Sequence, residues 1–86
     1  MMPTSAQVSV GTTPTLLVAS TGFDQTVWLH NSGGGTVFLG DSSVTTANGY
    51  KLDNGDKMQL LVGDHEGLYA ITAAGTNTVG VLKQIN

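Results

Sequence analysis

Turn-forming residues interrupt this sequence about every ten residues, which leaves no room for a substantial helix. Twelve glycines, together with Asn-Gly, Asp-Asn-Gly and Gly-Gly-Gly clusters, mark the interruptions. Gly and Asn adopt turn conformations at low cost. Between the turns, apolar residues alternate with polar ones, which is the period of a strand with one buried face. Because Gly or Asn cuts every helical stripe of apolar residues, the sequence predicts an all-β fold.

The alternation predicts a single small antiparallel β-sandwich, or jelly-roll-like domain, of about eight short strands. In the clearest run, Val27 and Leu29 alternate with Trp28 and a histidine, so one face is aliphatic and the other carries the single Trp. The runs that could supply the strands are residues 7–10, 15–19, 25–31, 36–40, 44–46, 50–52, 57–62, 68–73 and 78–85. The core expected from their aliphatic faces is Val27, Leu29, Val37, Leu39, Leu60, Val62, Ile71, Val79 and Val81.

A chain of 86 residues is long enough for one domain. A domain of this size buries only about 60–65% of the surface that its unfolded chain exposes, so contact with a partner would add stability. We expect residues 1–14 to form an extended N-terminal arm and the first strand. Residues 15–86 are expected to form the β-sandwich domain.

The composition disfavours several other classes of protein. A hydrophobic content of 40% is too high for a disordered chain. Three lysines against six acidic residues give a net charge of −3, which repels phosphate and disfavours nucleic acid as a partner. The absence of cysteine excludes disulfides and thiolate metal sites, and it fits an intracellular origin. We expect neither a signal peptide nor a membrane partner, because no basic leader and no run of eighteen apolar residues occurs.

Two turn motifs contain groups that bind ions in other proteins. Gly33-Gly34-Gly35 could present backbone N–H groups to a phosphate, but a phosphate loop leads into a helix, whereas the residues that follow have strand character. Asp53-Asn54-Gly55-Asp56 has oxygen ligands but lacks the alternating carboxylates and distal Glu of a calcium loop. We therefore interpret both segments as turns and expect no metal and no cofactor.

Asp64-His65-Glu66 is the densest polar cluster in the sequence, and a His between carboxylates could ligate a metal or act as a general base. Neighbouring strand residues point to opposite faces, however, and only His30 remains to complete a ligand set. No Gly-x-Ser-x-Gly elbow supports a serine nucleophile. We expect a solvated loop and no catalytic residues, and a small metal-binding or enzymatic domain is the least favoured alternative.

The large aromatic residues are too few, and too far from basic residues, to stack on single-stranded nucleic acid. They fit better as core or interface anchors. His30 could contact a neighbouring subunit, although the simpler interpretation is a half-buried His paired with a backbone group. The candidate interface residues are Met1, Met2, Pro3 and Thr4 of the arm, with Trp28, His30, Phe38, Tyr50 and Tyr69.

Several segments of the chain resemble small β-sandwich virion proteins of tailed bacteriophages, some of which decorate capsids. The resemblance covers roughly residues 25–82 and rests on strand and turn residues rather than on a catalytic signature. The segments are Val27-Trp28-Leu29-His30-Asn31-Ser32-Gly33, Val37-Phe38-Leu39-Gly40-Asp41-Ser42-Ser43-Val44-Thr45, Asn48-Gly49-Tyr50-Lys51-Leu52 with Gly55, Leu68-Tyr69-Ala70-Ile71 with Gly75-Thr76, and Val79-Gly80-Val81-Leu82.

This resemblance implies a non-enzymatic structural protein, made in the cytoplasm of a bacterial host and located on the capsid exterior of the virion. As a capsid decoration (cement) protein, it would bind the major capsid protein on the outside of a phage head and stabilise the shell. A homotrimer at a local threefold position could link weak contacts and raise avidity by about 100- to 10,000-fold.

The alternative is a phage tail, baseplate or fibre-associated β module that binds the host or another protein. In that case, Trp28, Tyr50 and Tyr69 would be the residues that stack on sugars. Both hypotheses concern binding and not catalysis.

Overall fold

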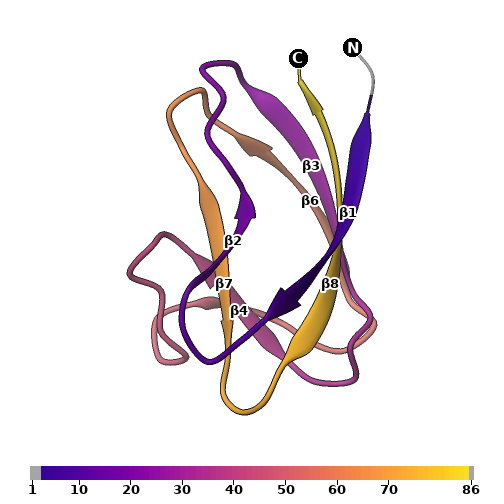
Figure 1. Ribbon diagram of the computed structural model, residues 1–86, viewed down its shortest axis with the longest axis vertical. Coiled ribbons are helices and arrows are strands. Elements are labelled where there is room, and N and C mark those ends of the chain that lie inside the picture. The colour runs from indigo at the N-terminus through magenta and orange to yellow at the C-terminus, as the bar shows by residue number, and fades with distance from the viewer. Residues whose placement is uncertain (1–2, 86) are drawn as a thin grey trace.

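Two layers of β-strands make up the computed structural model of the chain, which describes residues 3–85 (Figure 1). No helix occurs among these residues, so none could cross a membrane, and the predicted all-β class is confirmed. Each connection between strands contains at least one glycine, as the turn pattern indicates. In chain order the strands are β1 (Thr4–Val10), β2 (Thr15–Val18), β3 (Gln25–Asn31), β4 (Val37–Gly40), β5 (Tyr50–Leu52), β6 (Lys57–Val62), β7 (Leu68–Thr72) and β8 (Asn77–Ile85).

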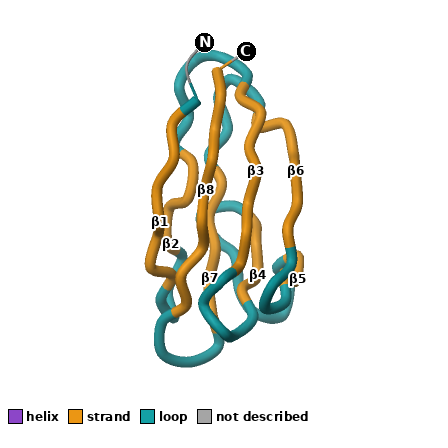
Figure 2. The backbone as a smooth tube through the Cα atoms, turned by 90° about the vertical axis from the view of Figure 1, so that its right-hand side faces the viewer, coloured by secondary structure: helices purple, strands orange, loops and turns teal. Residues whose placement is uncertain are grey.

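The strands form two antiparallel four-stranded sheets that pack face to face. Sheet A has the order β1-β8-β3-β6, and sheet B has the order β2-β7-β4-β5. Figure 2 shows the strands of sheet A side by side in this order. β1 pairs with β8, β2 with β7, β3 with β6 and β4 with β5. The pairing thus proceeds inward from the outermost strands to the β4–β5 pair. This is the arrangement of a jelly roll, and the predicted β-sandwich is confirmed.

The aliphatic face of each strand fills the space between the sheets. Leu29 on β3 is 2% exposed, and its cross-strand partners are Val81 on β8 and Met58 on β6. Of the predicted core residues, the central cluster contains Val27, Leu29, Val37, Leu39, Val62, Val79 and Val81. Leu60 packs against this cluster while partly exposed, and Ile71 is buried outside it. The cluster also includes residues that the alternation did not single out: Val10, Leu17, Val18, Leu52, Leu68 and Ala70.

The prediction of a strand at residues 44–46 is wrong. The β4–β5 loop forms turns, and within it the Gly49 N–H donates to the Thr45 carbonyl at 2.9 Å. Val44 is buried against Gly40, where an added Cβ would lie 2.8 Å from Val44 Cγ2. Val44 therefore supports sheet B by packing on its outer face and not by strand pairing. A run of three residues beside a turn has too few alternations to distinguish these two roles.

β1 begins three residues earlier than the alternation indicates. Thr4, which was expected in the N-terminal arm, pairs with Lys83 of β8, and the pairing continues unbroken along β1. The first four residues of this strand are exposed and include no large apolar side chain, so they give no period-two signal of their own. Pro3 precedes the strand and is exposed, whereas Met1 and Met2 lie outside the described residues.

A hydrogen bond between two buried asparagines joins β3 and β8 of sheet A at one end of the sandwich, and the Asn31 amide also reaches sheet B. Asn31 at the end of β3 is 0% exposed, and the Nδ2 of Asn77 at the start of β8 donates to its Oδ1 at 2.6 Å. Asn31 Nδ2 donates to the carbonyls of Gly35 at 2.8 Å and Leu52 at 2.9 Å. Asn31 Oδ1 also accepts from the Gly33 N–H at 3.3 Å. The Asn31 amide therefore makes all four hydrogen bonds of which it is capable.

The Gly33-Gly34-Gly35 segment wraps closely around the Asn77 side chain. The Gly35 N–H donates to Asn77 Oδ1 at 2.9 Å. A Cβ on Gly33 would clash with that oxygen and with the Thr78 nitrogen. Gly34 has a φ of 90°, in the left-handed region that favours glycine. Each of these glycines is thus accounted for by the path of the loop, in agreement with its interpretation as a turn.

Replacing Leu29 by Ala should lower the free energy of unfolding by about 2–4 kcal/mol, because the change leaves a cavity between the sheets. The control is Leu82→Ala on the outer face of the adjacent strand, where the side chain is 39% exposed. This variant should lose less than about 1 kcal/mol. Urea denaturation measures both, and equal losses would contradict the assignment of faces.

Replacing Asn77 by Asp should make stability depend on pH. The new carboxylate would have no N–H to donate to Asn31 Oδ1, and one of its own oxygens would face that oxygen. Burial of the charge and repulsion between the two oxygens both raise the pKa of the carboxylate in the folded state. Stability relative to the wild type should then fall as pH rises above the unfolded value of about 3.9, by up to about 1.4 kcal/mol per pH unit.

Asn48→Asp in the exposed β4–β5 loop is the control, because Asn48 Oδ1 already acts as an acceptor there, at 2.8 Å from the Thr45 nitrogen. Thermal unfolding between pH 3 and pH 8 compares the two variants. A loss for Asn77→Asp that does not change with pH would show that the Asn31–Asn77 bond is not buried as described.

Candidate interaction surface

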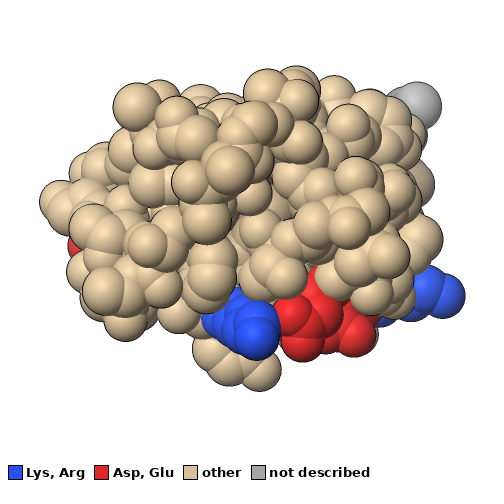
Figure 3. All heavy atoms as spheres, turned by 90° about the horizontal axis from the view of Figure 1, so that it is seen from below, with Lys and Arg blue, Asp and Glu red and all other residues tan. Residues whose placement is uncertain are grey.

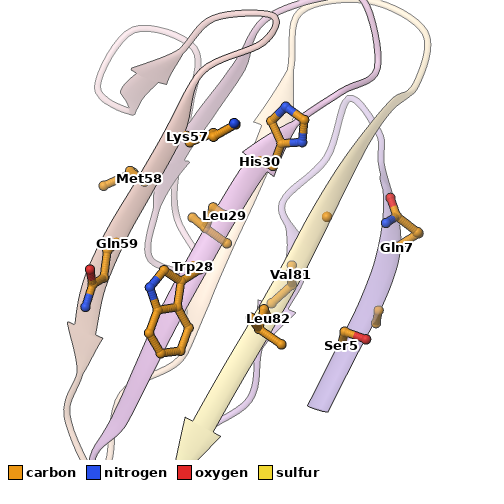
Figure 4. Close-up of a pocket in the computed structure, with 12 residues that line it drawn as sticks. Ser5, Gln7, Trp28, Leu29, His30, Lys57, Met58, Gln59, Val81 and Leu82 are labelled. Atoms are coloured by element: carbon orange, nitrogen blue, oxygen red, sulfur yellow. The ribbon is translucent and has the colours of Figure 1, made fainter. Parts of the chain in front are cut away.

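The outer face of sheet A is hollowed at its centre. The hollow has a volume of about 690 Å³ and is lined by residues from all four strands of the sheet (Figure 4). Within it, Gly80 on β8 has no side chain of its own between Gln7 on β1 and His30 on β3, and the Gln7 amide lies close to the position that a Cβ would take. The strands that carry these two flanking residues are about 10 Å apart, or two strand spacings. A volume of this size is typical of binding sites.

Trp28 forms the apolar centre of this hollow. In its cross-strand row, it lies between Leu82 on β8 and Gln59 on β6, and Ser5 on β1 follows Leu82. Figure 4 shows the indole ring with Leu82 on one side and Gln59 on the other. Trp28 is half-buried, so its ring is held in place while part of it stays accessible. Large aromatic side chains held in this way act as anchors in protein interfaces.

Polar side chains surround the apolar centre. Within residues 3–85, the side chains of Ser5, Gln7 and Gln59 make no hydrogen bond to the rest of the chain. His30 is exposed and also makes none, so its interpretation as a half-buried, paired His is wrong. Lys57 is the one charged residue of the lining, which contains no acidic side chain. These groups are available to form hydrogen bonds with a partner.

The other predicted anchors lie away from this hollow. Phe38 on β4 and Tyr69 on β7 are half-buried and alternate with core residues, so they lie on the outer face of sheet B. Tyr50 is exposed at the start of the edge strand β5. The structure thus brings Trp28 and His30 together and separates them from the other aromatic anchors. The set does not form one continuous surface.

The sequence interpretation did not single out three exposed apolar residues, Leu16, Phe23 and Leu61. Leu61 on the outer face of β6 is 62% exposed, and Phe23 in the β2–β3 loop is 60% exposed. Because Leu60 and Val62 were predicted in the core, alternation already placed Leu61 on the outer face, but Leu61 was not named as an interface candidate. Phe23 lies in a turn, where no periodicity applies. Leu61 extends the apolar part of sheet A to its β6 edge.

Asp64-His65-Glu66 forms a turn and not a convergent site. The Gly63 N–H donates to Glu66 Oε1 at 2.8 Å, so this carboxylate closes its own loop. His65 is exposed, with its Nε2 at 3.8 Å from an Asp64 carboxylate oxygen. His30 pairs with the first residue of β6, about 20 Å from the loop that follows that strand. Among the described residues, no three His, Asp or Glu side chains are grouped to hold a metal ion.

Asp53-Asn54-Gly55-Asp56 forms the turn that its composition predicts. The Asp56 N–H donates to the Asp53 carbonyl at 3.0 Å, and Gly55 has a φ of 85°. The Gly55 N–H also donates to the Asn31 carbonyl at 2.7 Å. The motif therefore connects β5 to β6 and is tied to the buried asparagine pair.

The surface carries few charges. Figure 3 views the end of the molecule that holds the β3–β4 and β7–β8 loops, where most of the visible charged side chains gather along the lower margin and a further acidic group shows at the left edge. Lys51 Nζ lies 3.6 Å from Asp53 Oδ1 in an exposed pair of the kind that contributes about 0–1 kcal/mol. The hollow itself has Lys57 as its one charged lining residue, so its surface is mainly apolar or uncharged and polar.

Comparisons with known proteins give a fold and no family. No protein-family model matches the chain, and no curated protein matches its sequence. A solved structure with the same fold comes from a study entitled "Bacillus endospore appendages form a novel family of disulfide-linked pili". The likeness has a TM-score of 0.63 and 12% identity, and it covers 98% of this chain and 85% of that one. At this identity, it shows the jelly-roll architecture alone.

Replacing Glu66 by Ala should lower the free energy of unfolding by about 1 kcal/mol, because the Gly63 N–H loses its acceptor. His65→Ala in the same loop should change stability by less than about 0.5 kcal/mol, since that ring is exposed. Chemical denaturation in the presence and absence of a chelator compares the two. Destabilisation by the chelator, or a larger loss for His65→Ala, would contradict the description of this loop as a simple turn.

Proposed function

We propose that this chain is a non-enzymatic structural subunit of a larger assembly, and specifically a decoration protein on the outside of a bacteriophage head. The observation that carries the proposal is the outer face of sheet A, where Trp28 and Leu82 lie at the centre of a ring of unpaired polar groups. An apolar centre with a polar rim is the anatomy of a protein interface.

The arrangement of the polar groups supports binding better than catalysis. Ser5 is the hydroxyl of the hollow and His30 its imidazole, but they lie two strands apart, on β1 and β3. This separation of about 10 Å across the sheet is too long for proton transfer between them. No carboxylate lines the hollow to orient the His.

The phage-head setting rests on the resemblance of residues 25–82 to small virion proteins, with the major capsid protein as the partner. A jelly roll is an architecture that capsid domains use, although a fold alone does not determine function. In this proposal, three copies occupy a local threefold position on the shell, each seating its hollow on a capsid subunit. Several weak contacts of this kind give an avidity that one contact lacks.

A second candidate is a subunit of a fibre, either a tail or baseplate module or a pilus-like filament. The likeness to the endospore appendage structure favours this candidate, because it spans nearly the whole chain. That protein forms disulfide-linked pili, whereas this chain has no cysteine. A filament of this chain would therefore depend on non-covalent contacts alone. Sugar recognition by a combined Trp28, Tyr50 and Tyr69 platform has no support, since those rings do not share a face.

The purified chain should cosediment with expanded heads assembled from a major capsid protein, and Trp28→Ala and Leu82→Ser should each weaken this binding at least about tenfold. Leu16→Ser is the control, because Leu16 is an exposed leucine on the outer face of sheet B. Trp28 is the single Trp, so a change in its fluorescence on binding reports contact at the hollow.

Analytical ultracentrifugation of the free chain gives the second measurement, with a mass three times 8.8 kDa expected for the trimer. A monomer that ignores the shells would overturn the decoration proposal. Filaments of the purified chain under the electron microscope would instead support the second candidate.

A further inference from the structure

The four edge strands of the sandwich differ in how well they are protected against pairing with another chain. Natural proteins protect edges by short strands, bulges, prolines or charged side chains. β2 is four residues long and has a register break between Leu16 and Val18. β5 is three residues long and contains Lys51, and β6 begins with Lys57. β2 and β5 therefore have two protective features each, whereas β6 has only the lysine at its first position.

β1 has none of these features. It is seven residues long, contains neither a charged residue nor a proline, and pairs with β8 without a register break. Its residues from Thr4 to Gln7 are all exposed. Among the described residues, no backbone hydrogen bond from a turn or loop reaches residues 4–10. The outer edge of β1 is thus a long, regular, uncharged edge that is open to a further strand.

We infer that the outer edge of β1 pairs with β6 of a neighbouring copy of this chain, so that sheet A continues from one copy to the next. The inference rests on the proposal that the chain works as a subunit of an assembly. The inference adds a contact between copies of the chain. Docking of the hollow on a capsid does not require this contact. Strand addition at an exposed edge is a common mode of protein association.

Strand direction supports β6 as the partner. In sheet A, the strands alternate in direction from β1 through β8 and β3 to β6. Because the sheet has four strands, its two edges run in opposite directions. A neighbouring copy in the same orientation therefore places its β6 antiparallel to β1. Two β1 strands, by contrast, would be antiparallel only if one copy were rotated by half a turn in the plane of the sheet.

The side chains of the two edges are also compatible. If the cross-strand rows of sheet A continue straight into the next copy, Gln59 of that copy lies beside Ser5, and its Lys57 lies beside Gln7. β1 has no charge, so Lys57 meets no like charge there. Opposite-edge pairing is head-to-tail, and it can close into a ring or continue as a fibre, depending on the angle between copies. The contact therefore fits both candidate assemblies.

Cysteine trapping tests this contact directly, because the chain has no cysteine of its own. Ser5→Cys and Gln59→Cys introduced together lie on opposite edges of sheet A, about 14 Å apart in one copy. A disulfide needs Cα atoms within about 7 Å, so this pair can form bonds only between copies. Mild oxidation of the folded double variant should give a ladder of disulfide-linked dimers, trimers and higher species on a non-reducing gel.

The matched control is Ser5→Cys with Thr46→Cys, which has the same number of thiols but places the second one in the exposed β4–β5 loop. The control should give at least about fivefold less of the species larger than dimers. In the inferred contact, the thiol at position 46 lies far from the thiol at position 5 of the neighbouring copy and cannot form a disulfide with it. Equal ladders from the two variants, or no ladder from the Ser5–Gln59 pair, would overturn the inference. Dimers from Ser5→Cys alone, with no ladder from the pair, would likewise overturn it in favour of β1–β1 pairing.

A charge change at the same edge gives a second readout. Gln7→Lys added to the Ser5–Gln59 cysteine pair should lower the ladder yield by about two- to fivefold, because it faces Lys57 of the neighbouring copy. Gln7→Glu at the same position should keep or raise the yield. The same response to both charges would contradict the expected register.

The shell-binding assay separates this inference from the proposed function. Ser5 and Gln59 line the hollow, so shell binding is measured with the unsubstituted chain. Cosedimentation of that chain with capsid shells, together with no ladder from the oxidised double variant, would overturn strand pairing and leave the decoration proposal standing. A ladder from the double variant, together with no shell binding by the unsubstituted chain, would support the pairing and overturn the decoration proposal. Circular dichroism of each variant before oxidation checks that the sheet content is unchanged.

Discussion

The hydrogen bond between Asn31 and Asn77 is the constraint on which one end of this fold depends. It joins two strands of sheet A and, through the Asn31 amide, reaches the backbone of sheet B at Leu52. A buried amide with all its hydrogen bonds made is strongly directional, and any shift of one strand would leave several groups unpaired. The three consecutive glycines follow from this bond, since the loop must pass close to the Asn77 side chain.

The sequence predicted the faces of the strands better than their contacts with one another. Alternation placed Val27 and Leu29 inside and Trp28 outside, because burial on one face is a local, period-two property. The asparagine pair could not be found in this way, since its members are 46 residues apart and look like ordinary turn residues. The hollow was missed for a related reason: it is lined by residues from four strands, and alternation does not show which strands are neighbours.

The two sheets have different relations to solvent. The outer face of sheet B is partly covered by the chain itself, because the β4–β5 loop lays Val44 against it. Among residues 3–85, no loop covers sheet A in this way, and the sheet combines the Trp28 hollow with the long open edge of β1. A small domain with few charges has little else to keep such a surface in solution. The proposal that the chain is a subunit of an assembly would account for this asymmetry, since a partner would then cover the apolar centre of sheet A.

The position of β8 has a consequence for how the chain folds as it is synthesised. In sheet A, β8 lies between β1 and β3, so β1 has no strand partner until β8 has been synthesised. Thr4 then pairs with Lys83. Such non-local pairing slows folding and leaves a strand edge unpaired until its partner is available. Sheet A can therefore close only late, whereas the β4–β5 pair is the most local contact from which folding can start.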